Sequence, residues 1–199
     1  MAAPTIYYIR HGETEWNAQG RLQGAQDVPL NDLGRKQAAA AGCILADLFA
    51  RDARSRASLA FVASPLGRAR STMELVRGTL KLPPGDYAID DRLREIAYGD
   101  WEGATLAQMQ AADPDVFAAR QSDKWTVAPP GGESYATVQA RVSDWYSQLT
   151  ADTVAVAHGV TARALMVALG IETSASAADL AIEQGAVYVF GQGGLSKYS

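Results

Sequence analysis

The sequence predicts an α/β sandwich in which a mostly parallel central sheet lies between layers of helices. Short, unbroken apolar runs rich in β-branched and aromatic residues recur along the chain, and long helical segments separate them. Strands that are buried on both faces of a parallel sheet have this composition. Their alternation with helices is typical of a doubly wound fold. We therefore expect three layers, with helices on both faces of the sheet and a small helical lid inserted in the chain.

The apolar runs place the strands and the periodic segments place the helices. Strands are expected at residues 5–9, 58–63 and 153–157, with a short edge strand at 87–90 and a final strand at 186–190. Helices are expected at 33–50, 66–80, 133–149 and 160–169, with a short polar helix at 175–180. Two short helices at 105–109 and 114–120 would form the lid. Asn31 or Asp32 can cap the first long helix and Ser64 the second, where Pro65 suits the opening turn.

Composition limits the class of protein. The 199 residues, 48% hydrophobic and 20% charged, fit one domain spanning 1–199. A net charge of −4 gives no support for binding nucleic acid, and no apolar run approaches the roughly 20 residues of a membrane span. The N-terminus lacks the basic and apolar regions of a signal peptide, so we expect a cytoplasmic protein. The single cysteine, Cys43, excludes an internal disulfide and is expected to be buried.

The chain has only two histidines, and both stand at the end of a strand-like run and before a glycine. His11 follows Arg10, and these side chains can face one site only if the chain curls as it leaves the sheet, with Gly12 allowing the curl. Ligands of open α/β sheets bind at the carboxyl ends of strands. A strand-end arginine is often only a solvated charge and a lone histidine a structural residue. The alternative is an anion site that contains a nucleophile or a base.

Two further segments carry chemistry. Arg68 falls in the first turn of a helix that begins at a strand end, where free N–H groups and the helix dipole favour phosphate. Arg70 and Arg77, farther along that helix, are expected on its solvated face. Glu95 lies between two apolar residues in an irregular stretch, residues 93–103.

Together these segments resemble the signatures of the histidine phosphatase superfamily, in particular its phosphoglycerate mutase-like branch. The matching motifs are Arg-His-Gly-Glu-Thr from residue 10, Ser-Pro-Leu-x-Arg-Ala from 64, Leu-x-Glu-Ile-x-x-Gly-x-Trp-Glu-Gly from 93 and His-Gly from 158. The resemblance covers residues 5–160 almost continuously.

The resemblance implies a role for each catalytic position. His11 would be the nucleophile that becomes phosphorylated, and its other ring nitrogen would need an acceptor such as a backbone carbonyl. Arg10, Arg68 and His158 would bind the phosphoryl oxygens, and Glu95 would give a proton to the leaving group. No metal and no other cofactor would be required.

The substrate side is implied less specifically. Asn17 would add a hydrogen-bond donor to the phosphoryl group, and Arg21, Gln23 and Gly24 would line the substrate side together with residues 105–125. The partner would be a small phosphorylated metabolite, and the chain would be a monomer or a homodimer.

Three activities are compatible with the resemblance. A metal-independent phosphomonoester hydrolase is favoured, because the segment between Gly103 and Glu133 is short and the Gly-Glu-Ser sequence at 132–134 is similar to that of phosphatase members. A cofactor-dependent phosphoglycerate mutase is the alternative. A regulatory module that only binds a phosphorylated ligand would need a missing catalytic residue, and all five positions are present.

Overall fold

The computed structural model describes residues 3–191 and 193–199, and these residues form one six-stranded sheet. Its strand order is β3-β2-β4-β1-β5-β6. The strands are β1 (Ile6–Arg10), β2 (Ala60–Ala63), β3 (Ala88–Ile89), β4 (Thr153–Ala157), β5 (Val187–Gly191) and β6 (Gly194–Tyr198). The first four are parallel, whereas β5 and β6 are antiparallel to their neighbours. The prediction of a mostly parallel sheet is confirmed.

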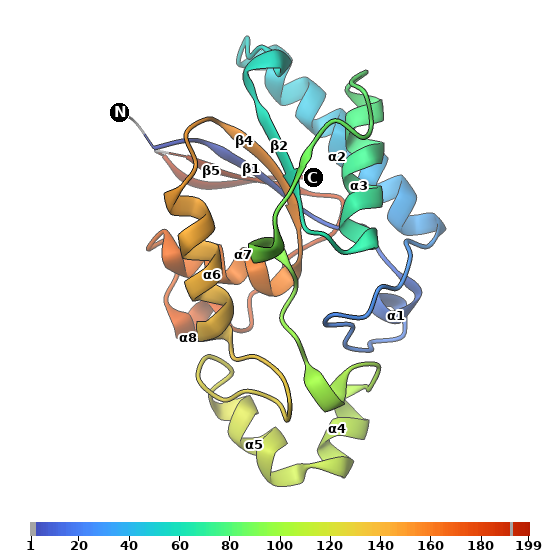
Figure 1. Ribbon diagram of the computed structural model, residues 1–199, viewed down its shortest axis with the longest axis vertical. Coiled ribbons are helices and arrows are strands. Elements are labelled where there is room, and N and C mark those ends of the chain that lie inside the picture. Colours follow the sequence, from blue (N-terminus) through green and yellow to red (C-terminus); the bar gives the residue numbers. More distant parts are fainter. Residues whose placement is uncertain (1–2, 192) are drawn as a thin grey trace.

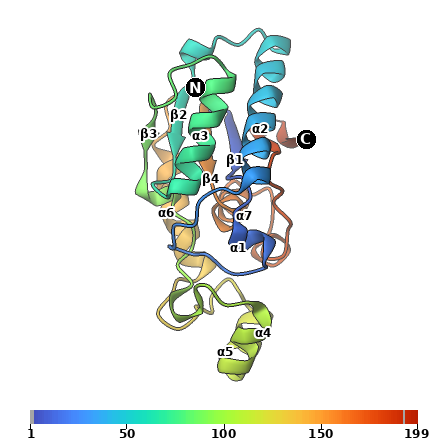
Figure 2. The ribbon, with the colours of Figure 1, turned by 90° about the vertical axis from the view of Figure 1, so that its right-hand side faces the viewer.

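Helices cover both faces of this sheet (Figures 1 and 2). On one face lie α2 (Asp32–Arg51) and α3 (Gly67–Thr79), and on the other α6 (Tyr135–Ser147) and α7 (Gly159–Ala168), with α8 (Ser174–Ala177) packed on α7. Alternate residues of β1 enter two separate cores. Tyr7 and Ile9 pack with residues of α2 and α3, and Ile6 and Tyr8 with residues of α6 and α7. The three-layer sandwich is therefore confirmed.

The lid consists of α4 (Leu106–Ala112) and α5 (Pro114–Ser122), which lie beyond the end of the sheet (Figure 1). The indole N–H of buried Trp101 donates to Asp113 Oδ2 at 2.8 Å, at the junction of the two helices. Short 3₁₀ helices at Arg56–Ser58, Asp91–Leu93 and Gly99–Trp101 complete the connections. No helix among the described residues is both long enough and apolar enough to cross a membrane.

Two elements were not expected from the sequence. The one-turn helix α1 (Glu15–Ala18) begins at Thr14, whose hydroxyl accepts a hydrogen bond from the Asn17 N–H. Strand β6 follows the strand that we expected to be the last, and it pairs with β5 up to Gly191 and Gly194. As a mostly exposed edge strand it has no apolar run that would reveal it.

Three side chains differ from their predicted environments. Ser64 does not cap α3, because Leu66 is the residue before the first turn and no side chain caps it. Cys43 is exposed, since it stands two positions from both buried Ala41 and buried Leu45 and so falls on the opposite side of α2. Arg77 is buried at the end of α3 rather than solvated.

Candidate active site

The carboxyl ends of three adjacent parallel strands bring the predicted site residues together. Arg10 ends β1 and His11 follows it, Ser64 follows β2, and His158 follows β4. The His11 N–H donates to Ala157 O and the Ser64 N–H to Val156 O, both at 2.9 Å, so main-chain pairing continues past the strands into the site. The rings of His11 and His158 lie with their centroids 5.1 Å apart.

The His11 ring is held in one tautomer. Its Nδ1 lies 2.7 Å from the carbonyl oxygen of Gly12, and because a carbonyl can only accept, Nδ1 carries the hydrogen and Nε2 keeps its lone pair. Burial, followed by the charges of Arg68 and Arg10, holds the pKa of His11 well below its usual value. His11 is therefore a neutral imidazole, and the backbone carbonyl that we expected beside it is confirmed.

Gly12 is needed for a close approach rather than for an unusual backbone angle, which corrects the reason we gave for it. It is not among the residues with positive φ. A Cβ at this position would lie 2.1 Å from Gly34 O, so the first turn of α2 could not pack here against the chain that leaves β1. This contact fixes the carbonyl that holds His11.

Whereas His11 is held through Nδ1, His158 is held through Nε2. Its Nε2 lies 2.7 Å from Ser64 Oγ. Its main-chain N–H donates to the Tyr8 hydroxyl oxygen at 2.9 Å, and the Tyr8 hydroxyl donates to His158 O at 2.6 Å. Burial, together with Arg68 and its other basic neighbours, holds the pKa of His158 well below its usual value, so this ring is neutral as well.

Two arginines flank the histidines. Arg68 is 1% exposed, and its Nη1 and Nη2 donate to the carbonyl oxygens of Gln26 and Gly24 at 2.5 and 2.8 Å. Arg10 donates from Nη1 to Ile182 O at 2.7 Å. Burial lowers the pKa of both guanidinium groups, but from a value so high that both stay charged.

Unpaired polar atoms gather at this site. Among the residues that the structure describes, four buried side-chain nitrogen or oxygen atoms have no hydrogen-bond partner: Arg10 Nε, Arg68 Nε, His158 Nδ1 and Gln23 Oε1. A buried donor without a partner costs about 1–3 kcal/mol, which folded proteins accept mainly where a ligand completes the set. The three nitrogens suit an anion.

Glu95 lies in the irregular segment after Asp91–Leu93, and its carboxyl group contacts the start of α7 beside His158. Its Oε2 accepts from the Gly159 N–H at 3.1 Å, and its Oε1 accepts from the N–H groups of Val160 and Ile96 at 3.2 and 3.1 Å. Two carboxyl oxygens have about four lone-pair positions, so three donors leave one position free. Main-chain N–H groups therefore fix the carboxyl group in place.

The four residues expected on the substrate side have different surroundings. Asn17 Oδ1 accepts from the Thr14 N–H at 3.2 Å and from the Gln184 amide at 3.0 Å, so it fastens the α1 turn. Arg21 donates to Gly103 O at 2.7 Å and ties this loop to the segment that precedes the lid. Gly24 provides a carbonyl that holds Arg68, and Gln23 is buried beside it.

The sequence reasoning missed two residues of the site. Ser64 contacts His158, and Glu102 supports the loop that holds Arg68. Glu102 accepts from the Ala25 N–H at 2.8 Å and from the Gln26 side-chain amide at 3.0 Å. Both positions belong to the motifs that carry the family resemblance, and that was the available signal.

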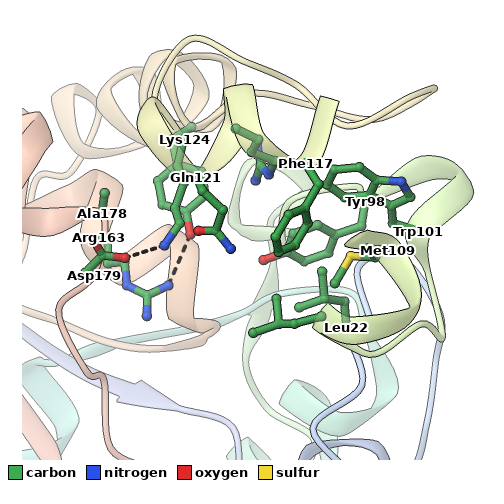
Figure 3. Close-up of a pocket in the computed structure, with 13 residues that line it drawn as sticks. Leu22, Tyr98, Trp101, Met109, Phe117, Gln121, Lys124, Arg163, Ala178 and Asp179 are labelled. Carbon is green, nitrogen blue, oxygen red and sulfur yellow. Dashed lines mark hydrogen bonds and ion pairs between the residues drawn. The ribbon is translucent and has the colours of Figure 1, made fainter. Parts of the chain in front are cut away.

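A cavity of about 220 Å³ lies between the lid and residues of α7 and of the segment that follows α8 (Figure 3). One side is apolar and aromatic, and includes Tyr98, Trp101, Met109 and Phe117. The other side is charged: Lys124 pairs with Asp179, and Arg163 donates to the Tyr135 hydroxyl at 3.3 Å. The Arg120 guanidinium lies between the sides, 5.8 Å from the centre of the Tyr98 ring and 5.5 Å from that of the Tyr135 ring. Burial, together with Tyr135 and Glu95, raises the pKa of Tyr98 well above its usual value, so this cavity-lining hydroxyl is un-ionised.

No group of three or more His, Cys, Asp or Glu side chains in the described ranges, 3–191 and 193–199, is arranged to hold a metal ion.

Comparison with known proteins agrees with this geometry. A family profile described as the histidine phosphatase superfamily, branch 1, matches residues 6–194. A glucosyl-3-phosphoglycerate phosphatase of Mycolicibacterium vanbaalenii is 38% identical over 182 residues, which cover 85% of this chain and 75% of that protein. A 2,3-bisphosphoglycerate-dependent phosphoglycerate mutase of Methylocella silvestris is 35% identical over 82% of this chain and 80% of its own length. The structure of a mycobacterial glucosyl-3-phosphoglycerate phosphatase complexed with VO3 matches with a TM-score of 0.80 and 31% identity, over 98% of this chain and 96% of that one.

Proposed function

The chain belongs to branch 1 of the histidine phosphatase superfamily and is a phosphatase, and from this premise we propose that it hydrolyses a small phosphate monoester by passing the phosphoryl group first to His11 and then to water. One observation carries the proposal. His11, whose Nε2 keeps its lone pair, lies at the shared end of three strands beside two arginines, Arg10 and Arg68, that each have a buried and unpaired Nε–H.

In the first step, His11 Nε2 attacks phosphorus and the bond from phosphorus to the ester oxygen breaks. Charge on the phosphoryl oxygens is matched by Arg10, Arg68 and His158. Fixed donors in a buried site stabilise such charge without reorganising, which is the main contribution that a protein makes to phosphoryl transfer. His11 Nδ1 keeps its hydrogen and its hydrogen bond to Gly12 O, so the ring becomes an N-phosphoimidazolium without losing its orienting contact.

Glu95 handles the protons of both steps. In its protonated form it gives a proton to the departing alkoxide, and as a carboxylate it takes one from the water that attacks phosphohistidine. That attack breaks the bond between phosphorus and Nε2, restores the lone pair of His11 and releases inorganic phosphate. The three main-chain N–H groups keep the carboxyl in place through the cycle.

The leaving alcohol would occupy the cavity under the lid. Its aromatic side suits the faces of a sugar or another compact apolar group, and Lys124 and Arg163 on its charged side suit a carboxylate. Relatives named for glucosyl-3-phosphoglycerate act on an ester with both features. We propose a phosphorylated hydroxy acid, free or glycosylated, as the substrate class.

A trapping experiment tests the chemistry. The enzyme is mixed with p-nitrophenyl phosphate, quenched in alkali after a few milliseconds and digested. We expect a phosphate-sized mass increase on the peptide that contains His11, and equal activity with and without EDTA. Phosphate on another residue would contradict the nucleophile, and loss of activity in EDTA would contradict the metal-free reaction.

A substrate panel tests the leaving group. We expect glucosyl-3-phosphoglycerate and 3-phosphoglycerate to exceed glycerol 3-phosphate in kcat/KM by about tenfold, the effect of one well-placed charged contact. Lys124→Met and Arg163→Met should reduce that ratio, whereas Lys81→Met, an exposed lysine after α3, should leave it unchanged. Adding 2,3-bisphosphoglycerate to the 3-phosphoglycerate reaction distinguishes the mutase, which would give 2-phosphoglycerate instead of free phosphate.

A further inference from the structure

The two histidines lie side by side but are held through different ring nitrogens. His11 bonds to the Gly12 carbonyl through Nδ1, and His158 bonds to the Ser64 hydroxyl through Nε2. The Gly12 carbonyl settles the tautomer of His11, because it can only accept. A hydroxyl can donate or accept, so the tautomer of His158 depends on the other contacts of Ser64.

Ser64 is fully buried, and its oxygen already accepts one hydrogen bond. The Leu66 N–H points to Ser64 Oγ at 3.4 Å. Within the described part of the chain, His158 Nε2 is the one remaining partner of this hydroxyl. If the hydroxyl donates to Nε2, both its hydrogen and its lone pair are used, and the single hydrogen of the neutral ring is on Nδ1.

The opposite orientation leaves two groups unsatisfied. With the hydrogen on Nε2, the buried hydroxyl hydrogen of Ser64 would have no acceptor among the described residues, at a cost of about 1–3 kcal/mol. His158 Nδ1, which is buried without a partner, would then carry a lone pair. A lone pair beside Arg10 and Arg68 would repel the anion that these two cations attract.

We propose that Ser64 is a positioning residue that fixes His158 in the Nδ1–H tautomer. Both histidines then have the same tautomer but opposite roles: His11 presents a lone pair to phosphorus, and His158 presents an N–H to a phosphoryl oxygen. The use of that N–H in catalysis rests on the proposed function, whereas the tautomer itself does not. The donor is neutral, so its hydrogen stays on the ring throughout the cycle.

Nuclear magnetic resonance of the resting enzyme tests the tautomer directly. The protein is labelled with ¹⁵N at the histidine rings, and a long-range ¹H–¹⁵N correlation spectrum distinguishes Nδ1–H, Nε2–H and the cation. Because the chain has two histidines, two ring systems are expected. We expect both as Nδ1–H at neutral pH. An Nε2–H or cationic His158 in the wild type would overturn the proposal, whether or not the enzyme is active.

Variants test whether Ser64 is the cause. In Ser64→Ala we expect His158 to populate the Nε2–H tautomer in part, while His11 stays in the Nδ1–H tautomer. We expect kcat/KM to fall by about tenfold, the usual effect of removing a residue that orients a functional histidine by a hydrogen bond. Ser64→Cys has nearly the same volume and a weaker donor, so a partial shift is expected and provides the test should the alanine variant not fold. An unchanged His158 signal in either folded variant would overturn the role of Ser64.

A matched control removes another buried hydroxyl. Thr153 begins β4, at the opposite end of the strand from His158, and its hydroxyl donates to Ala151 O at 2.8 Å. Thr153→Val should lower the melting temperature and leave both ring signals unchanged. If the wild-type spectrum is as expected but the enzyme hydrolyses no ester, the proposed function fails and the tautomer assignment stands.

Discussion

The two ends of helix α3 each bury an arginine, and the two arginines are used in different ways. Arg77, in the last turn, is 3% exposed, stacks over the Phe61 ring at 4.5 Å and donates from Nε to Pro83 O at 2.8 Å. Arg68, in the first turn, is 1% exposed and has no partner at Nε among the described residues. Its other two nitrogens are held by carbonyls of the loop that covers the helix start.

The difference shows that burial alone does not identify a binding arginine. Arg77 makes its hydrogen bonds and its aromatic contact within the fold, so it stabilises the packing of α3 against β2. Arg68 is oriented by the fold but left with a free donor beside two neutral imidazoles. An oriented, buried and unpaired donor is the feature that marks the site.

The largest expected effect is that of replacing His11, which lies beside Arg68 at the first turn of α3. His11→Ala should lower kcat by at least about 10⁴-fold, because the variant lacks the proposed acceptor of the phosphoryl group. The protein should stay folded, since among the described residues the ring makes one hydrogen bond, to the Gly12 carbonyl. Turnover and circular dichroism check this. Residual activity within tenfold of the wild type would mean that another residue is the nucleophile.

Glu95→Gln should separate substrates by their leaving groups. A poor leaving group needs a proton and a good one does not, so phosphoryl transfer from alkyl phosphates should fall by about 10²–10⁴-fold and transfer from p-nitrophenyl phosphate much less. The attack of water on phosphohistidine should be slower than in the wild type, because the variant lacks the carboxylate that takes the proton from water. A burst of nitrophenol is therefore expected in stopped flow.

Equal loss on both substrates without a burst, together with a lower melting temperature, would give Glu95 a structural role at the start of α7 instead. The three main-chain N–H groups that it accepts make that alternative a real one. A glutamine retains one acceptor oxygen, so the comparison of substrates within one variant decides between the two roles.

Arg68→Lys and Arg77→Lys test the two ends of α3 against each other. Both retain the charge and lose the planar fork. Arg68→Lys should lower kcat/KM by about 10²–10³-fold, the usual cost of one oriented donor to transition-state charge. Arg77→Lys should keep kcat/KM within about threefold and lower the free energy of unfolding by about 1–2 kcal/mol. Equal effects on activity would remove the distinction between the two ends.

The sequence predicted the layers, the parallel strands and the order of the site motifs, because each of these depends on a strong local pattern. What it could not predict depends on contacts between distant segments. The partner of Ser64 is 94 residues away in the chain, and the loop that holds Arg68 is 42 to 44 residues away. Arg77 was wrongly placed in solvent, because an arginine in a helix pattern does not reveal that its stem lies over an aromatic ring.

The last expected effect concerns the dependence of stability on pH, which involves the two histidines beside Arg68 and not Arg77. His11 and His158 are buried and neutral, with pKa values held well below the usual 6.5, mainly by burial. Between the folded and unfolded pKa values the unfolded chain binds more protons, so the stability present above about pH 6.5 is lost as the pH falls. Carboxylates such as Asp90, whose pKa is lowered by Arg92, lose their contribution only below about pH 4.

Urea unfolding at pH 6.5 and pH 5 isolates the histidines, because the ion-paired carboxylates stay charged in that range. Each buried histidine contributes a slope of up to about 1.4 kcal/mol per pH unit, so the free energy of unfolding should fall by about 3 kcal/mol between these two values. In His158→Gln about half of that fall should remain, since only His11 is left to titrate. Arg77→Lys should lower the stability equally at both pH values and keep the full fall. A fall of the same size in His158→Gln as in the wild type would show that the acid sensitivity arises outside the site.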